Sequence, residues 1–591
     1  MRLHKGSRAA LLLLLVHAAG TVVAAVNFDQ CLNDIVQNAN TTGDLNGLLD
    51  GNGNPVSNIS DATSISYSMC TSSCGTGQEA FQWSEFSQEF SAWLLPNLAL
   101  ISQLPFGAQY RLDNLMSAVL TVGSPTLAGY SLFITLLNSR WITHRFGLLN
   151  DHPNSRFALS ILSSLQQVPL RLHPDRERLP SLVLPETEWW KCLAEFVDYT
   201  HTWSIASATS IAWVIVAYIL TVANSLSNVY ANVQSNGEAT GSMWLWLIPI
   251  VVGWLQLSPK CDFERLQAAY DRADRHSMHI GTTDVRHGVG ALPASSRRAL
   301  AITAKENDVM SPDELFTPPV FNYSRSLRWA STAETVFTVF KEDTEASEKV
   351  HLSVYGSNAD ESGTNDPTDH VDTVQYIDTK QDNCDKKERR GSLQYSVMYC
   401  AEPDGVQSQC SHWAPGVFTR MFIASCASLA LQWGTVGAAF VVGWFTPTTK
   451  IGCRSLGYLL YGAISTLVWM MLLISGILAH SAAADPRRAS LSTRVALAFS
   501  HILRWTGKLF AILNFFLVIM ACVFQYSNFY DRCFCNSSVF SRGGAAYDVI
   551  IETTAQAAQA KAAWIGALVL ACTSASAFLG ILNLLLDTLP S

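Results

Sequence analysis

Two cysteines and a glycosylation sequence lie side by side near the C-terminus, in the stretch YDRCFCNSSVF at residues 530–540. Each cysteine can form a disulfide, and Asn536 begins an Asn-x-Ser sequon. Disulfides persist in oxidising compartments, and sequons are modified in the secretory pathway. The chemistry of this stretch is therefore that of a loop outside the cytosol.

The segments that we assign to the same side as this loop contain enough cysteines for three disulfides. These cysteines are Cys31, Cys70, Cys74, Cys453, Cys533 and Cys535. A direct bridge between Cys533 and Cys535 would be strained, so we expect each to bond the N-terminal segment or Cys453. Asn40, Asn58 and Asn536 also fall on this side and are the predicted glycosylation sites.

Residues that could carry catalysis are missing from the apolar segments of the sequence. These segments contain no carboxylate, whereas enzymes and ion pumps that work inside a bilayer normally keep charged side chains there. Lys508 lies close enough to the end of its segment to reach the surface. No phosphate-binding glycine loop or H-E-x-x-H motif appears, and Cys400, Cys410 and His412 lack the paired spacing of a zinc site. We therefore predict no catalytic residue, no metal and no cofactor, and a protein that is not an enzyme.

The composition indicates a membrane protein. Of the 591 residues, 49% are hydrophobic and only 15% are charged, against about 25% in soluble domains. The net charge of −8 is spread along the chain, and no basic face predicts binding to nucleic acid. The predicted partner is the lipid bilayer.

The cysteines and sequons must be positioned by apolar helices of about 20 residues, the length that crosses about 30 Å of hydrocarbon. Residues 1–25 have the layout of a cleaved signal peptide. The predicted spans are 115–137, 203–224, 243–257, 421–445, 456–479, 505–524 and 563–586. The fold class is thus an all-α integral membrane protein with about seven transmembrane helices.

Two of these assignments depend on proline and tryptophan. Residues 91–106 contain two prolines and are predicted to be interfacial or re-entrant, with an eighth crossing as the alternative. Pro125 should kink the first span. Trp244, Trp246 and Trp254 flank the short third span in the manner of interfacial anchors.

The sidedness follows from the distribution of charge. With seven crossings after the leader, basic residues are roughly twice as frequent at the cytosolic ends of the spans as at the opposite ends. An eight-crossing arrangement would place residues 258–420 outside, where the sequon at Asn322 could be used, but would also expose Arg487 and Arg488 there. We predict entry into the secretory pathway and residence in the plasma membrane or an endomembrane.

The spans and the polar stretches between them divide the chain into six parts. After the signal peptide come a cysteine-containing glycosylated segment at 26–90, the interfacial segment at 91–114, three spans within 115–257, a polar and mostly disordered cytosolic loop at 258–420, and four spans within 421–591.

The long loop contains an apolar island at residues 311–340, in which 333–340 is predicted to form a short helix. Such an island either packs back on the cytosolic helix ends or docks a soluble protein partner. Ser392 and Ser490 each follow a pair of arginines and are predicted phosphorylation sites.

Three stretches of the sequence, WLLPNLALISQLPFG, LMSAVLTVGSPTLAGYSLFITLLN and PDELFTPPVFNYSRSLRW, resemble an uncharacterised family of polytopic membrane proteins from filamentous fungi. The resemblance implies a fungal, signal-bearing, multi-span protein, and it brings no activity.

Two functions are compatible with these features. The first is a non-enzymatic sensor-like or scaffold-like membrane protein with an exterior cap and a long cytosolic loop. The alternative is a transporter or channel for a neutral or lipophilic solute, with hydroxyl-lined spans that include Ser207, Thr209 and Ser210. The sequence leaves the oligomeric state open.

Overall fold

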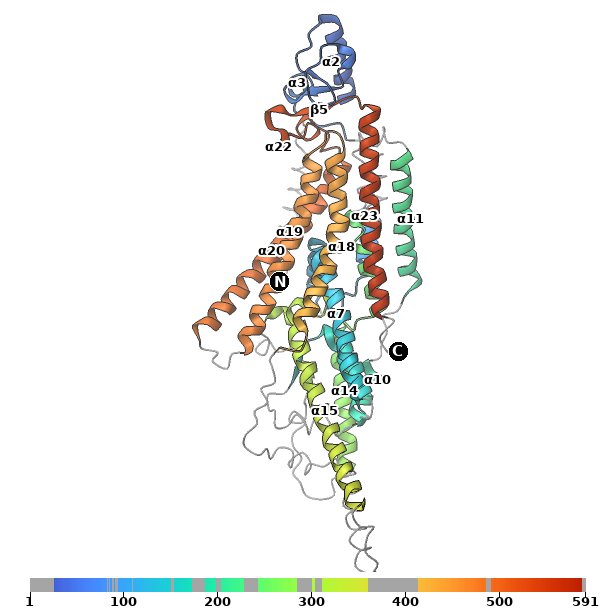
Figure 1. The fold of residues 1–591 in the computed structure, drawn as a ribbon, viewed down its shortest axis with the longest axis vertical. Coiled ribbons are helices and arrows are strands. Elements are labelled where there is room, and N and C mark those ends of the chain that lie inside the picture. Colours follow the sequence, from blue (N-terminus) through green and yellow to red (C-terminus); the bar gives the residue numbers. More distant parts are fainter. Residues whose placement is uncertain are drawn as a thin grey trace, which may run out of the picture.

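The computed structural model describes residues 26–81, 83, 86, 87, 90, 94–108, 110–149, 154–172, 187–197, 203–227, 243–283, 300–302, 311–359, 413–484 and 490–586. The described chain is mostly helical and elongated, with a small cap at one end and the long helix α15 reaching toward the other (Figure 1). We call these the cap end and the α15 end. The predicted signal peptide, Ser392 and residues 360–412 lie outside the described residues.

Five helices are long and apolar enough to cross a membrane. They are α11 (Ile205–Ser227), α18 (Val417–Phe445), α19 (Cys453–Ala484), α20 (Leu491–Tyr526) and α23 (Thr554–Leu586). Each exceeds the length of about 20 residues that the hydrocarbon core requires. They confirm the second span and the last four spans as apolar helices.

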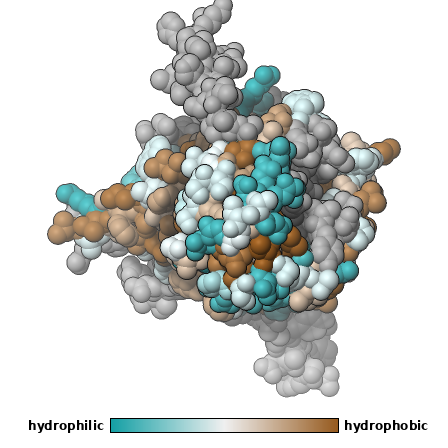
Figure 2. Space-filling view, turned by 90° about the horizontal axis from the view of Figure 1, so that it is seen from above, coloured by the Kyte–Doolittle hydropathy of each residue, from teal (hydrophilic) through white to brown (hydrophobic). Residues whose placement is uncertain are grey.

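The outer faces of these helices are apolar. On α20 the exposed large side chains recur at the spacing of one helix face, as Ile502, Trp505, Leu509, Leu513, Phe516 and Met520. Seen from the cap end, hydrophobic residues extend at the sides of the molecule, beyond the more polar residues near its centre (Figure 2). In water such an uninterrupted stripe would be costly, whereas in a bilayer it faces lipid.

The cap is built from both halves of the chain. It contains α2 (Phe28–Thr42), β1 (Leu48–Leu49), η1 (Ile59–Asp61), β2 (Ser64–Ser66) and α3 (Tyr67–Ser73), joined by α21 (Cys533–Asn536), α22 (Val539–Arg542), η11 (Gly543–Ala545) and β5 (Tyr547–Val549). The strands form one antiparallel sheet in the order β1-β2-β5. A segment from the loop between α20 and α23 thus completes a sheet that the N-terminal residues begin.

Three disulfides tie the cap together and to the bundle. Cys31 pairs with Cys74 inside the cap, Cys70 with Cys533, and Cys453 at the start of α19 with Cys535. Cys533 and Cys535 are therefore bonded to separate partners rather than to each other. A domain of this size buries little apolar surface, so such bridges supply much of its stability.

The segment predicted as the first span is a broken helix. α6 (Arg111–Gly123) and α7 (Pro125–Phe146) meet at Ser124 with a bend of 104°. The kink expected at Pro125 is present, because proline lacks the amide proton and clashes with the preceding turn. The kink predicted in the first span is thus a sharp break, and the pair is a broken span or a re-entrant loop.

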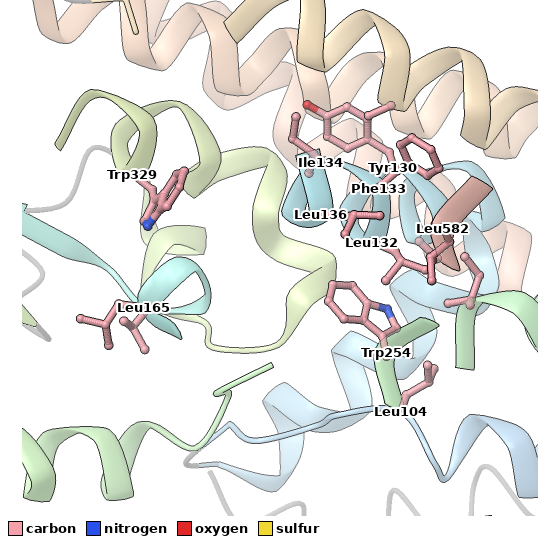
Figure 3. Packing of buried hydrophobic residues seen from close by; sticks show 14 of the residues in the cluster. Leu104, Tyr130, Leu132, Phe133, Ile134, Leu136, Leu165, Trp254, Trp329 and Leu582 are labelled. Carbon is pink, nitrogen blue, oxygen red and sulfur yellow. The ribbon is translucent and has the colours of Figure 1, made fainter. Parts of the chain in front are cut away.

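α7 forms the centre of the apolar core. Tyr130, Leu132, Phe133, Ile134 and Leu136 are all buried and pack near Trp254 and Leu582 (Figure 3). These last two come from α13 (Leu247–Leu257) and α23.

The predicted third span is only partly helical. α13 covers 11 residues, too few to cross a bilayer alone. Trp244, Trp246 and Trp254 are buried against neighbouring helices. The prediction that they anchor the span at the membrane surface was wrong, because α7 and α23 cover α13.

Residues 91–106 were predicted to lie at the interface or to re-enter. The described part contains α5 (Leu95–Ile101), which packs against α11 and α13. Leu100 and Asn97 are buried. Leu95 and Leu98 are 48% and 49% exposed, so α5 packs on the protein with one face and leaves the other uncovered.

The loop predicted to be mostly disordered holds two long helices, α14 (Phe263–Thr283) and α15 (Asn322–Ala359). The remaining elements at this end are η3 (Gly147–Leu149), α8 (Ser155–Ser164), η4 (Leu165–Gln167), β3 (Leu170–Leu172), α10 (Thr187–Val197), β4 (Leu300–Ile302), η9 (Pro312–Leu315) and η10 (Pro319–Phe321). β3 pairs antiparallel with β4. α14 packs on α10, and α15 on α7 and α19, so tertiary contacts order segments whose composition alone predicts disorder.

Candidate functional site

Residues 311–328, which we call the insert, fill the space between helices near the α15 end of the bundle. Val320, Phe321 and Tyr323 are buried in one cluster with Leu120 of α6, Leu127 of α7, Val468 and Leu472 of α19, and Ala511 of α20. The interpretation in which the 311–340 island packs back on the helix ends agrees with this burial. Its apolar side chains are covered by the protein itself, so they do not form the free docking surface of the alternative interpretation.

A buried carboxylate lies at the centre of the insert. Asp313 accepts hydrogen bonds from the Tyr323 hydroxyl and the Lys508 ammonium, and its Oδ2 lies 4.0 Å from Arg504 Nε. Arg504 Nη1 also donates to Ser311 Oγ at 2.7 Å. Lys508 was predicted to extend to the membrane surface, and this prediction was wrong, because the carboxylate gives the ammonium a partner within the protein.

Further polar contacts fix the insert on its other side. Glu314 pairs with Arg328 at 2.6 Å, and Arg325 donates to the Pro318 carbonyl at 3.0 Å. Burial lowers the pKa of Arg325 to about 10, which leaves the guanidinium charged at neutral pH. Buried charges are tolerated when hydrogen bonds surround them, so these contacts specify one position for the insert.

The sequon at Asn322 belongs to this packed region. Asn322 is buried, and its side-chain amide donates to Thr135 Oγ1 at 2.6 Å and to the Ser131 carbonyl at 3.3 Å. An amide held in this way has no room for a glycan. The disagreement between this sequon and the predicted sidedness is thereby removed.

A second polar site surrounds the break between α6 and α7. Breaking a helix exposes carbonyls at the end of α6 and amides at the start of α7. The Tyr461 hydroxyl donates to the Val122 carbonyl at 2.7 Å, and Asn514 Nδ2 donates to the Gly123 carbonyl at 2.8 Å. Ser124 Oγ accepts from the Leu127 amide at 3.3 Å and caps α7.

Gln432 of α18 links this break to α19. Its Oε1 accepts from the Thr126 amide at 3.2 Å and from the Thr126 and Ser465 hydroxyls. Its Nε2 donates to the Gly462 carbonyl at 2.8 Å and to Thr466 Oγ1 at 3.0 Å. Every hydrogen-bonding position of this buried amide is occupied, as a low-dielectric site requires.

Glycine permits the closest approach at the break. A Cβ on Gly123 would lie 2.1 Å from the carbonyl oxygen of Ala511 in α20. α6 and α20 are therefore in backbone contact, which Asn514 reinforces from the next turn of α20.

Both outer ends of the broken pair reach the region around the insert and α15. Asp113, near the start of α6, is close enough to Lys508 for the two charges to interact. Arg145, near the end of α7, forms an ion pair with Glu334 of α15. The outer ends of the broken pair thus interact with α20 and α15, respectively.

A small cavity lies between the break and the insert. Its volume is about 20 Å³, room for about one water molecule, and Thr121, Ser131, Trp254 and Pro318 are among its lining residues.

The hydroxyl residues predicted to line the spans, Ser207, Thr209 and Ser210, lie on α11 and are not the residues that bond at the break. Thr126, Gln432 and Asn514 gather at the break, whereas Ser207 bonds Gln103 of the segment after α5 at 2.5 Å. Thr209 is exposed and its hydroxyl bonds the carbonyl of Ile205 in its own helix. Tyr461 and Ser465 were not among the predicted residues, because hydroxyls in an apolar run indicate helix packing as readily as a site.

The remaining predicted positions lie at the two ends. Asn40 and Asn58 are exposed on the cap, and Asn536 is the last residue of α21, directly after the disulfide cysteine Cys535. Ser490 caps α20 by accepting from the Thr493 amide at 3.2 Å. Among the described residues, no group of three or more acidic, cysteine or histidine side chains could hold a metal ion.

These observations define a class, a multi-span membrane protein with five or six helices long and apolar enough to cross a bilayer. Comparison with known proteins found no matching family model, no matching curated protein and no matching solved structure. The family resemblance of the three sequence stretches is therefore not supported, and the class stands on the helices alone.

Proposed function

We propose that this protein is a non-enzymatic, sensor-like membrane protein that couples its cap to the helix α15. One relationship carries the proposal: α20 is connected to the cap at one end and ion-paired with the insert through Lys508 and Arg504 further along. The insert includes the first turns of α15, which at 38 residues is about 57 Å long. A displacement of α20 would therefore act on α15.

The connection at the cap end is rigid. Arg454 of α19 donates to Gln525 near the end of α20 at 2.7 Å and pairs with Asp531 at 3.0 Å. Two residues after Asp531, Cys533 is bonded to Cys70 of the cap. A movement of the cap thus reaches α20 through covalent and charged contacts rather than through a flexible linker.

We place the cap outside the cytosol and α15 inside it, since disulfides persist in oxidising compartments. The carbonyl of Ala80 accepts from Asn528 at the cap, while that of Gly107 accepts from Thr317 of the insert at 2.9 Å. The chain therefore passes from the cap end to the α15 end between residues 80 and 107. With the α6–α7 pair re-entrant, this segment, α11, the α13 region, α18, α19, α20 and α23 make seven crossings.

Hydrogen exchange on the full-length protein in lipid nanodiscs tests the coupling. Replacing Cys70 and Cys533 by serine releases the cap from the α20–α23 loop, and we expect amide exchange in the insert and the first turns of α15 to rise by about 5- to 150-fold. Replacing Cys31 and Cys74, which form a bridge inside the cap, is the matched control and should change insert exchange much less. Equal insert exchange in the two variants would refute the coupling.

The alternative, transport of a neutral or lipophilic solute, has one observation in its favour. Broken helices whose ends face polar side chains mark the substrate sites of many transporters. Flux of a small neutral solute such as glycerol into proteoliposomes tests it. Gln432→Leu should then abolish flux, whereas Thr573→Val, on an exposed turn of α23, should not. Flux that does not exceed that of protein-free vesicles would remove this alternative for such solutes.

A further inference from the structure

The joint between cap and bundle contains a buried acid on β5. β5 pairs with β2, the Tyr67 amide donates to the Ala546 carbonyl at 2.9 Å, and the Ile550 amide donates to the Thr63 carbonyl at 2.9 Å. Asp548 is the middle residue of β5 and is 8% exposed. The cap is therefore held to the α20–α23 loop by a short strand that carries a carboxyl group at its centre.

The surroundings of Asp548 are apolar. Its cross-strand partner is Ile65, which is fully buried in the cap core with Phe28, Leu48 and the bonded Cys70 and Cys533. Directly paired residues on antiparallel strands project to the same face, so the carboxyl group faces this core. An ionised carboxylate in such a place loses its hydration without gaining a counter-ion.

The charged groups around Asp548 add to this cost. The elements packed on β5 are β2, α3 and α21, of which α3 contributes the Tyr67 phenol. Asp531 is close enough to Asp548 to repel a second negative charge, and Asp531 is itself paired with Arg454 at 3.0 Å. Arg542 lies over the ring of the adjacent Tyr547. Burial and, secondly, Asp531 raise the pKa of Asp548 to about 7.

We propose that this joint is a proton-operated contact, in which neutral Asp548 holds β5 against β2 and ionised Asp548 loosens the pair. The inference deepens the proposed function, on which it rests, by naming the acidity of the cap-side compartment as the stimulus. The disulfide between Cys70 and Cys533 keeps the cap attached when the strands separate.

The direction follows from linkage. The pKa of Asp548 in the folded joint lies above its value of 3.8 when exposed, so the closed joint binds the proton more tightly than the open one. The joint is therefore most stable in acid, and stability is lost as pH rises from about 4 to about 7. Each pH unit in this interval changes the open-to-closed ratio up to about tenfold.

The test is hydrogen exchange of the β2 and β5 amides in full-length protein in nanodiscs between pH 5 and 8, corrected for intrinsic exchange. We expect wild-type opening to increase by about 10- to 100-fold from pH 5 to 7 and then to level off. Asp548→Asn, which resembles the neutral acid, should open rarely and without this pH dependence. Asp50→Asn, at a partly exposed cap carboxyl whose pKa is lowered by hydrogen bonds from Asn54, should keep the wild-type profile. A wild-type profile in Asp548→Asn would overturn the proposal.

A second variant guards against misfolding of the first. Asp531→Asn removes the like charge and should lower the pH at which the joint opens; an unchanged midpoint would also count against the proposal. Both readouts concern the joint alone. If opening of the joint depends on pH but exchange in the insert does not change with it, the coupling of the cap to α15 is refuted and the proton-operated contact stands. If opening of the joint does not depend on pH, the proton-operated contact is refuted and the coupling can still hold.

Discussion

Lys508 of α20 donates to the Asp313 carboxylate, which joins a membrane helix to a loop residue 195 positions earlier. Asp313 is almost fully buried and Lys508 is 16% exposed. The pair replaces water as the partner of each charge, and Tyr323 and Arg504 complete the surroundings of the carboxylate. The position of the insert, and with it the start of α15, is thus set by groups on α20.

Asp313→Asn should destabilise the protein by about 3 to 5 kcal/mol, because Lys508 and Arg504 would stay buried without their carboxylate. Thermal unfolding in detergent and protease cleavage within residues 311–328 measure the effect. Glu345→Gln is the matched control, since Glu345 pairs with Lys341 at 3.5 Å on an exposed face of α15 and should change stability by less than about 1 kcal/mol. Similar losses in both variants would mean that the buried pair does not hold the insert.

Gly123→Ala should destabilise the protein by about 1 to 3 kcal/mol, because the added Cβ would overlap the Ala511 carbonyl and push α6 away from α20. Gly566→Ala on α23 meets no atom within 4 Å and should be neutral or stabilising by up to about 1 kcal/mol through helix propensity. Thermal unfolding of the two variants, compared in the same detergent, separates the helix break from an ordinary helix position. Stabilisation by Gly123→Ala would contradict the close contact.

The sequence predicts apolar helices well and their spatial partners poorly. α18, α19, α20 and α23 follow from composition alone, because long apolar runs have one stable form in a bilayer. Pro125 predicted a kink, but the sharp break depends on Gly123 meeting Ala511 and on Asn514, which lies 391 residues from the carbonyl it binds. No local pattern encodes contacts over such separations.

The buried carboxylate of the insert escaped prediction for a related reason. Asp313 lies in a polar loop without periodicity, so nothing local distinguishes it from a solvated acid, and Lys508 near the end of a span has an ordinary explanation at the surface. Trp246 was misassigned because tryptophan serves both at interfaces and in cores, and burial by α7 and α23 decides between them. The cysteine pattern was more informative, since the strain of a Cys533–Cys535 bridge is enough by itself to exclude that pairing.

Gln432→Leu should cost about 1 to 3 kcal/mol, because it removes the acceptor of the Thr126 amide and leaves buried hydroxyls unpaired. Gln432→Glu should cost more, since a buried carboxylate replaces an amide that donates to Gly462 and Thr466. Denaturation in detergent checks both. If the leucine variant were as stable as wild type, the network would not hold the helix break, and its role in any solute path would lose its structural basis.

The two ends of the molecule should differ in glycosylation when the chain is inserted into microsomes. Asn40 and Asn58 are exposed on the cap, so we expect a glycan on each that endoglycosidase removes, and each of Asn40→Gln and Asn58→Gln should abolish one. Asn322 should carry none, because its amide is buried against Thr135 and we expect its loop to face the cytosol. A sequon introduced at 341–345, on exposed turns of α15, separates these two reasons: it should stay unmodified. A glycan there would place α15 outside the cytosol, on the same side of the membrane as the cap. The chain could then not cross the membrane an odd number of times between the cap and α15.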